Sequence, residues 1–149
     1  MEGCLVDTNV FLRMLNRADP LCSRAHQAVN RAIDEGYHLY VAPQILAEFW
    51  NVATRPVSAN GLGWSVGQTL REVHHIITLF DLLYTQDGFK EFSIWLTIVS
   101  QYSVSGKQVH DARLIATMAA HGVRFLLTFN TQDFQRYSDM ITILDAAAP

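Results

Sequence analysis

Two patterns of hydrophobic and polar positions alternate along the chain. One is a short continuous apolar run, and the other is a longer stretch with apolar residues every three or four positions. The short runs predict buried strands, and the longer stretches predict amphipathic helices. We expect strands at residues 3–6, 38–42, 81–84, 124–128 and 140–144, helices at 8–15, 23–35, 43–55, 65–79, 88–104 and 108–121, and a turn at 130–133.

This alternation of strands and helices predicts the fold class. Strands joined through helices form right-handed crossovers, which give a parallel sheet with helices on both faces. The expected fold is therefore α/β, a three-layer α/β/α sandwich with a central, mostly parallel sheet. The 149 residues are half hydrophobic and contain no repeat or linker, so we expect residues 1–149 to form a single domain.

Charge and cysteine content narrow the functional classes. The formal net charge of −3 argues against a broad basic surface for nucleic acid, although a metal site can bind phosphate through its ion. Cys4 and Cys22 form no CxxC or Cys/His cluster, which argues against structural zinc. We see no secretory signal and no apolar stretch of transmembrane length, and two free thiols fit a reducing compartment, so the expected location is cytoplasmic.

Three acidic residues occupy corresponding places in the predicted fold. Asp7 follows the first strand, and Glu48 lies about one turn into the helix that follows the second strand. Asp111 lies in the first turn of the helix that leads into the fourth strand. Strand carboxyl ends and the starts of the helices meet at one edge of such a sheet, so these residues and the 130–133 turn can converge there.

Clustered carboxylates repel one another unless a cation neutralises them, and oxygen ligands suit Mg²⁺ or Mn²⁺. A bound ion of this kind lowers the pKa of water and holds a scissile phosphate. Each acid alone would be interpreted as a capping or solvated residue. Their joint placement therefore favours a metal-dependent phosphodiesterase site.

Four segments carry a family resemblance. They are "LVDTNVFLRML" (5–15), "PQILAEFWNVATRP" (43–56), "GKQVHDARLIATMAAHGV" (106–123) and "LLTFNTQDF" (126–134). In this order they resemble the motifs of PIN-domain proteins, specifically VapC-like toxin ribonucleases, over nearly the whole chain. The resemblance implies a Rossmann-like sandwich and a Mg²⁺- or Mn²⁺-dependent endoribonuclease acting on RNA. It also implies the toxin of a type II toxin–antitoxin pair, with a cognate antitoxin and a homodimer.

The resemblance also implies residue roles. It assigns metal-site carboxylates to Asp7, Glu48 and Asp111, orienting or water-positioning hydroxyls to Thr8 or Thr128, and a hydrogen bond to Asp7 from Asn9. The fourth position departs from the fuller pattern, because many members have Asp where this chain has Asn130, while others carry an acid three residues later, as Asp133 is here. Our hypothesis is that Asp133 completes the acidic set and that Asn130 offers a carbonyl to a metal ion or its water, which leaves the number of ions, one or two, open.

Three other functions stay under consideration. A structure-specific DNA nuclease would use the same acids, and a non-catalytic PIN-fold binding domain would explain the neutral Asn130. A phosphoacceptor receiver domain is disfavoured, because its first loop needs an acid pair and Asp7 is followed by Thr8.

Several surface candidates have two interpretations each. Arg13, Lys107 and Arg113 either contact RNA phosphates or are ordinary surface charges. Trp50, Trp64 and Trp95 either stack on bases or pack in the core, and core packing is favoured for Trp50 and Trp95. Val29 and Ile33 either receive an antitoxin segment in a groove or pack inside the molecule.

Overall fold

The computed structural model describes residues 1–149 and contains a five-stranded, all-parallel sheet. Its strands lie in the order β3-β2-β1-β4-β5. Their bounds are β1 Gly3–Val6, β2 His38–Val41, β3 Asp81–Leu82, β4 Phe125–Thr128 and β5 Thr142–Asp145. The predicted α/β class with a parallel sheet is confirmed.

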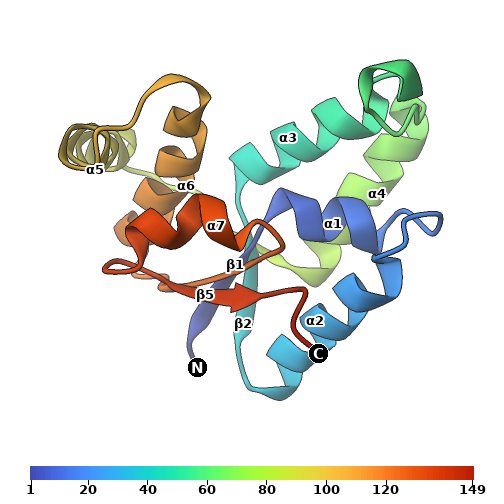
Figure 1. Ribbon diagram of the computed structural model, residues 1–149, viewed down its shortest axis with the longest axis horizontal. Helices are drawn as coiled ribbons and strands as arrows, with labels where there is room; N and C mark the ends of the chain where they lie inside the picture. The colour runs from blue at the N-terminus through green and yellow to red at the C-terminus, as the bar shows by residue number, and fades with distance from the viewer.

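Helices flank the sheet on both sides. They are α1 Thr8–Met14, α2 Cys22–Asp34, α3 Pro43–Thr54, α4 Val66–Leu79, α5 Gly88–Gln101, α6 Val109–Ala120 and α7 Thr131–Phe134, with short 3₁₀ segments at Val57–Ala59, Gly106–Gln108 and Gln135–Tyr137. Figure 1 shows α1–α4 on one side of the sheet and α5 and α6 on the other, with α3 and α4 projecting together beyond the sheet. No helix is both long and apolar enough to cross a membrane.

Four elements differ from the sequence-based expectation in type or by more than one residue. The helix expected to reach residue 104 ends at Gln101, because Ser103 has a left-handed backbone (φ 51°) that stops the helix. The 130–133 segment forms the short helix α7 instead of a turn. Strand β3 has only two residues, and β5 begins at residue 142, because Met140 and Ile141 both donate backbone hydrogen bonds to the Tyr137 carbonyl in a turn.

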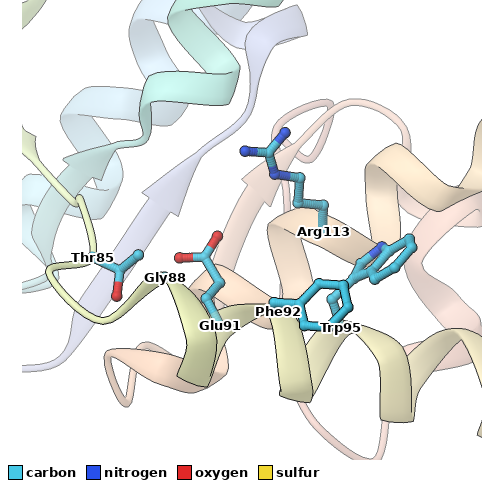
Figure 2. Close-up of a pocket in the computed structure, with 6 residues that line it drawn as sticks. All are labelled: Thr85, Gly88, Glu91, Phe92, Trp95 and Arg113. Carbon is cyan, nitrogen blue, oxygen red and sulfur yellow. The ribbon is translucent and has the colours of Figure 1, made fainter.

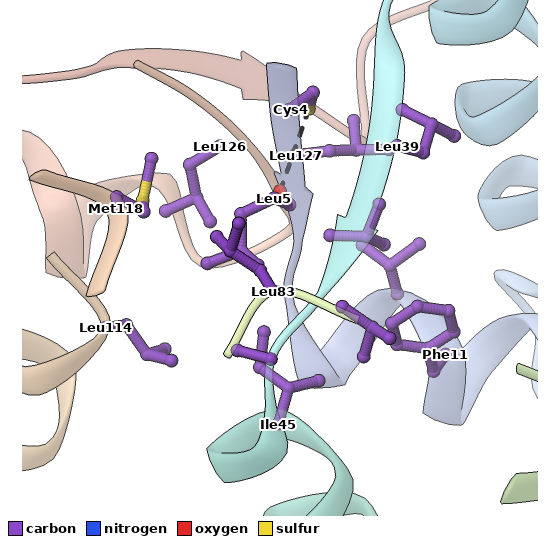
Figure 3. Close-up of a cluster of buried hydrophobic side chains, with 14 of the residues drawn as sticks. Cys4, Leu5, Phe11, Leu39, Ile45, Leu83, Leu114, Met118, Leu126 and Leu127 are labelled. Atoms are coloured by element: carbon purple, nitrogen blue, oxygen red, sulfur yellow. Dashed lines mark hydrogen bonds between the residues drawn. The ribbon is translucent and has the colours of Figure 1, made fainter. Parts of the chain in front are cut away.

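The central strand β1 and its neighbour β4 are the most deeply buried part of the sheet. Apolar side chains cover both faces of β1 and β4, as expected for a parallel sheet between helix layers. Figure 3 shows Leu5, Leu126 and Leu127 packed with side chains from the surrounding helices. Burial raises the pKa of the Cys4 thiol to about 12, so this cysteine is a neutral, structural core residue.

The strand order reverses between β1 and β4. From β1 the chain builds outward through β2 and β3, and it then crosses to the opposite side of β1 to form β4 and β5. In open α/β sheets, ligands bind at the carboxyl ends of the strands where the order reverses. Val6 and Leu127 are register partners, and the Asp7 amide donates to the Leu127 carbonyl at 3.0 Å. This reversal therefore brings Asp7 and Thr128 together.

Candidate functional site

Asp7 lies at the centre of the candidate site, with only 5% of its surface exposed. Its Oδ1 accepts a hydrogen bond from the Thr8 amide (2.8 Å), which caps the start of α1. Its Oδ2 accepts from Asn9 Nδ2 (3.0 Å) and Thr128 Oγ1 (2.8 Å). Burial raises the Asp7 pKa, the charge of Glu48 adds to this effect, and the three hydrogen bonds oppose it. The carboxylate is thus fixed in position but lacks a compensating charge.

The Thr128 hydroxyl connects three segments beneath Asp7. It donates to Asp7 and accepts from Asn9 Nδ2 (3.1 Å) and from the Asn130 amide (2.9 Å). Asn9 Oδ1 in turn accepts from the Phe129 amide at 3.0 Å. These contacts join α1 to the connection between β4 and α7, so Asn9 and Thr128 both orient Asp7.

Glu48 is held beside Asp7 by two side chains. Its Oε2 accepts from Thr8 Oγ1 (2.8 Å), and its Oε1 accepts from Gln44 Nε2 (2.9 Å). Gln44 Nε2 also donates to the His110 carbonyl at 2.8 Å, immediately before Asp111. Gln44 therefore links α3 to the start of α6.

Gln44 was not among the site residues predicted from the sequence. Its spacing of four residues from Glu48 on one helix is a signal for a side-chain pair that was there to be found. Its contact with His110, 66 residues away, has no signal in a single sequence.

Asp111 lies close enough to the other three acids for their charges to affect its pKa. Burial raises its pKa to about 6, with further contributions from the charges of Asp7, Asp133 and Glu48, while His110 opposes them. Each of these charges must lie near Asp111 to act on it, so all four predicted carboxylates share one region. None of the four takes part in a salt bridge.

Two exposed residues at the start of α7, Asn130 and Asp133, are the candidates for the fourth position of the site. The Asn130 amide donates to Thr128 Oγ1, but its side chain makes no hydrogen bond. Asp133 lies in the first turn of α7, and its charge reaches Asp111. Of these two side chains, that of Asp133 is therefore the one that interacts electrostatically with Asp111.

The donor chemistry fits a hydrated divalent cation. No three His, Cys, Asp or Glu side chains converge tightly enough to form a complete metal cage. Mg²⁺ needs only one or two carboxylates, because it retains several waters and also binds substrate phosphate. The buried Asp7, with its raised pKa and no cationic partner, provides such an anchor.

The other candidates fall into distinct environments. Arg13 pairs with Asp19 at 3.3 Å, and its guanidinium lies 5.0 Å from the centre of the Phe129 ring. Trp64 packs edge-on to Phe49, with ring centres 6.1 Å apart, which ties the loop after α3 to the core. The remaining positions are a partly buried Trp50, an exposed Lys107, a buried Val29 and an Ile33 that is 55% exposed.

Comparisons with known proteins give a consistent family and fold. The PIN domain matches residues 4–140. VapBC-1 from nontypeable Haemophilus influenzae has a TM-score of 0.66 at 16% identity, covering 98% of this chain and 99% of that chain. VapC20 from Mycobacterium tuberculosis, described as a sarcin-ricin loop cleaving toxin, has a TM-score of 0.63 at 14% identity, covering 93% and 96%.

A toxin–antitoxin complex from Klebsiella pneumoniae also matches, with a TM-score of 0.63 at 17% identity, covering 96% of this chain and 97% of that chain. At these identities the similarity shows a shared fold. A search of curated proteins finds no significant match.

Proposed function

This chain belongs to the PIN-domain family, and from that premise we propose that it is a Mg²⁺- or Mn²⁺-dependent endoribonuclease. The observation that supports the proposal is the joint position of Asp7, Glu48, Asp111 and Asp133 where the strand order reverses. Four carboxylates without a cationic partner suit a site that is completed by a metal ion and an RNA phosphate.

The chain's own residues prepare this chemistry. When bound, a divalent ion would supply a water of lowered pKa and positive charge for the scissile phosphate. Asp7 is held in one orientation by Thr8, Asn9 and Thr128. Glu48 is held by Thr8 and Gln44. The surrounding carboxylates disfavour the charged form of Asp111, so a bound cation would strongly stabilise its carboxylate.

A cleavage assay tests the function. Purified protein is incubated with matched single-stranded RNA and DNA in Mg²⁺, in Mn²⁺ and in EDTA. We expect RNA cleavage that requires the metal ion and is lost in Asp7→Asn and Asp111→Asn. Asp34→Asn, which removes an exposed acid near the end of α2, serves as the matched control and should retain activity.

The same assay distinguishes the other functions. Cleavage of DNA alone would replace the proposal with a DNA nuclease. Absence of metal-dependent cleavage of either substrate would favour a non-catalytic binding domain, which the neutral Asn130 would then explain.

We also propose that the protein acts in the cytoplasm as a homodimeric toxin with a cognate antitoxin. Structures with the same fold include VapBC and toxin–antitoxin complexes. Exposed apolar side chains on α2 and α4 offer surface for a partner, among them Ile33, Val66, Leu70 and Ile77. Co-expression with a small reading frame adjacent to the gene should yield a stable complex with reduced RNA cleavage. Analytical ultracentrifugation of the free protein should show a dimer.

A further inference from the structure

A cavity of about 380 Å³ opens between the start of α5 and the exposed side of α6. Figure 2 shows its lining residues, which are Thr85, Gly88, Glu91, Phe92, Trp95 and Arg113. A smaller hollow of about 160 Å³ shares Thr85, Glu91 and Arg113 with it and is also lined by Gln44. Gln44 donates to Glu48 Oε1 at 2.9 Å, so the lining of the smaller hollow is in direct contact with the acidic site.

Two aromatic rings form one wall of the cavity. Phe92 is 52% exposed, and its ring centre lies 6.0 Å from that of Trp95 at an interplanar angle of 33°. Trp95 Nε1 donates to the Val109 carbonyl at 3.1 Å, which holds the indole in place. Partly exposed aromatic rings beside a phosphate site are suited to stacking a nucleobase.

Two charged side chains of opposite sign line the same cavity without pairing. Glu91 Oε1 accepts from Thr117 Oγ1 at 2.7 Å, while its Oε2 has no partner in the protein. The Arg113 guanidinium makes no side-chain hydrogen bond and no salt bridge. In Figure 2 the Glu91 carboxylate and the Arg113 guanidinium lie on the same side of α5, and both side chains extend away from its backbone. A carboxylate and a guanidinium are therefore both available to a ligand.

We propose that this cavity is a nucleotide subsite for the RNA next to the scissile phosphate, an inference that rests on the proposed function. The base stacks against Phe92, Glu91 Oε2 accepts hydrogen bonds from the edge of the base, and Arg113 binds an adjoining phosphate. Guanine fits best, because its N1–H and N2–H groups are parallel donors that match a carboxylate. Uracil fits worst, because its two carbonyl oxygens face the Glu91 charge.

The test measures binding of mononucleotides, which contain no scissile internucleotide bond. Calorimetric titration in Mg²⁺ compares guanosine 5′-monophosphate with uridine 5′-monophosphate. We expect wild type to prefer the guanosine nucleotide by about tenfold. Glu91→Gln should remove most of this preference, whereas Phe92→Ala and Arg113→Gln should weaken both nucleotides about tenfold. Phe89→Ala is the matched control, because Phe89 is on the same helix and 78% exposed but does not line the cavity.

Three outcomes would overturn the subsite. The first is equal binding of both nucleotides, and the second is an equal loss in Phe92→Ala and Phe89→Ala. The third is a change of oligomeric state in Phe92→Ala with unchanged nucleotide affinity, which would assign this face to a second copy of the chain. Thermal denaturation of each variant identifies any unfolding, and Arg113→Gln supplies a second test from an exposed position.

Failure of the subsite and failure of the nuclease proposal are distinguishable. RNA cleavage that requires Asp7 and Asp111, with no selective nucleotide binding, would remove the subsite and leave the nuclease. Selective binding at Phe92, Glu91 and Arg113 without cleavage would retain the subsite in a protein that binds RNA but does not hydrolyse it.

Discussion

The two halves of the acidic site are built differently. On the inner side, Asp7, Asn9 and Thr128 form a continuous set of hydrogen bonds at the ends of β1 and β4. On the outer side, Asp111 and Asp133 are more exposed, and their carboxylates accept no hydrogen bond from the protein. The inner side thus fixes one carboxylate, whereas the outer side is free to adjust to an ion and a substrate.

The largest expected effect is at the centre of the inner half. Asp7→Asn should reduce RNA cleavage by about 10³-fold, because it removes the charge of the best-positioned carboxylate. In EDTA the same variant should be about as stable as wild type, because removing a buried charge that burial and Glu48 disfavour offsets the loss of one acceptor oxygen for the groups that donate to Asp7. RNA cleavage and thermal denaturation check the two parts, and a clearly destabilised variant in EDTA would contradict this interpretation of Asp7.

Thr128→Val should have the next largest effect. The substitution keeps the side-chain shape but removes the hydroxyl that contacts Asp7, Asn9 and the Asn130 amide. We expect cleavage to fall about 10- to 100-fold and unfolding free energy to fall by about 1–3 kcal/mol. Thr142→Val, at an exposed position on β5, is the matched control. Equal activity of the two variants would mean that the inner half needs no hydroxyl for its geometry.

Much of the inner half was predictable from sequence. Asp7 and Thr128 end buried apolar runs, and strand ends meet at one edge of a parallel sheet. Glu48, and Asp111 on the outer side, followed from helices that start at that edge. The order of the strands was not predictable from these patterns, because hydrophobic periodicity does not say which strands are neighbours.

The outer half and the cavity were less accessible to sequence analysis. Residues 130–133 have turn-forming side chains, yet the backbone forms a short helix once the Asn130 amide bonds to Thr128. The Glu91–Thr117 contact joins α5 to α6 across 26 residues, which a single sequence does not reveal. Local propensity therefore predicts elements well, while contacts between distant side chains require the fold.

A smaller effect is expected at the outer half. Asp133→Asn should reduce cleavage about tenfold, because it removes one exposed charge that acts on Asp111 and leaves the hydrogen-bonded half intact. Asn130→Ala should have less effect, since the hydrogen bonds of Asn130, from its amide to Thr128 Oγ1 and to its carbonyl from the Asp133 amide, are all made by its backbone. Full activity in Asp133→Asn with a loss in Asn130→Ala would reverse the assignment of the fourth position.

The smallest effect concerns stability and pH in the absence of metal. The Asp111 pKa is raised from 3.8 to about 6, so the folded state holds this proton more tightly than the unfolded state. The resulting stabilisation is complete below pH 3.8 and is lost as the pH rises through about 6. After allowance for solvent screening it amounts to about 1 kcal/mol.

Urea denaturation in EDTA across this pH range provides the measurement. Asp111→Asn should lack this part of the pH dependence, and Mg²⁺ should suppress it in wild type. Identical pH profiles for wild type and Asp111→Asn would show that burial and the surrounding carboxylates do not raise the pKa of Asp111.

If Asp7, Glu48, Asp111 and Asp133 hold a divalent ion, the metal-free protein should bind Mn²⁺ through them. Electron paramagnetic resonance measures the free aqueous Mn²⁺ that remains when protein is added. We expect wild type to remove Mn²⁺ from solution in proportion to protein concentration, Asp7→Asn and Asp111→Asn to remove far less, and the Asp34→Asn control to bind as wild type does. Binding that is equal in all four proteins, or absent from wild type, would contradict a metal site at these carboxylates.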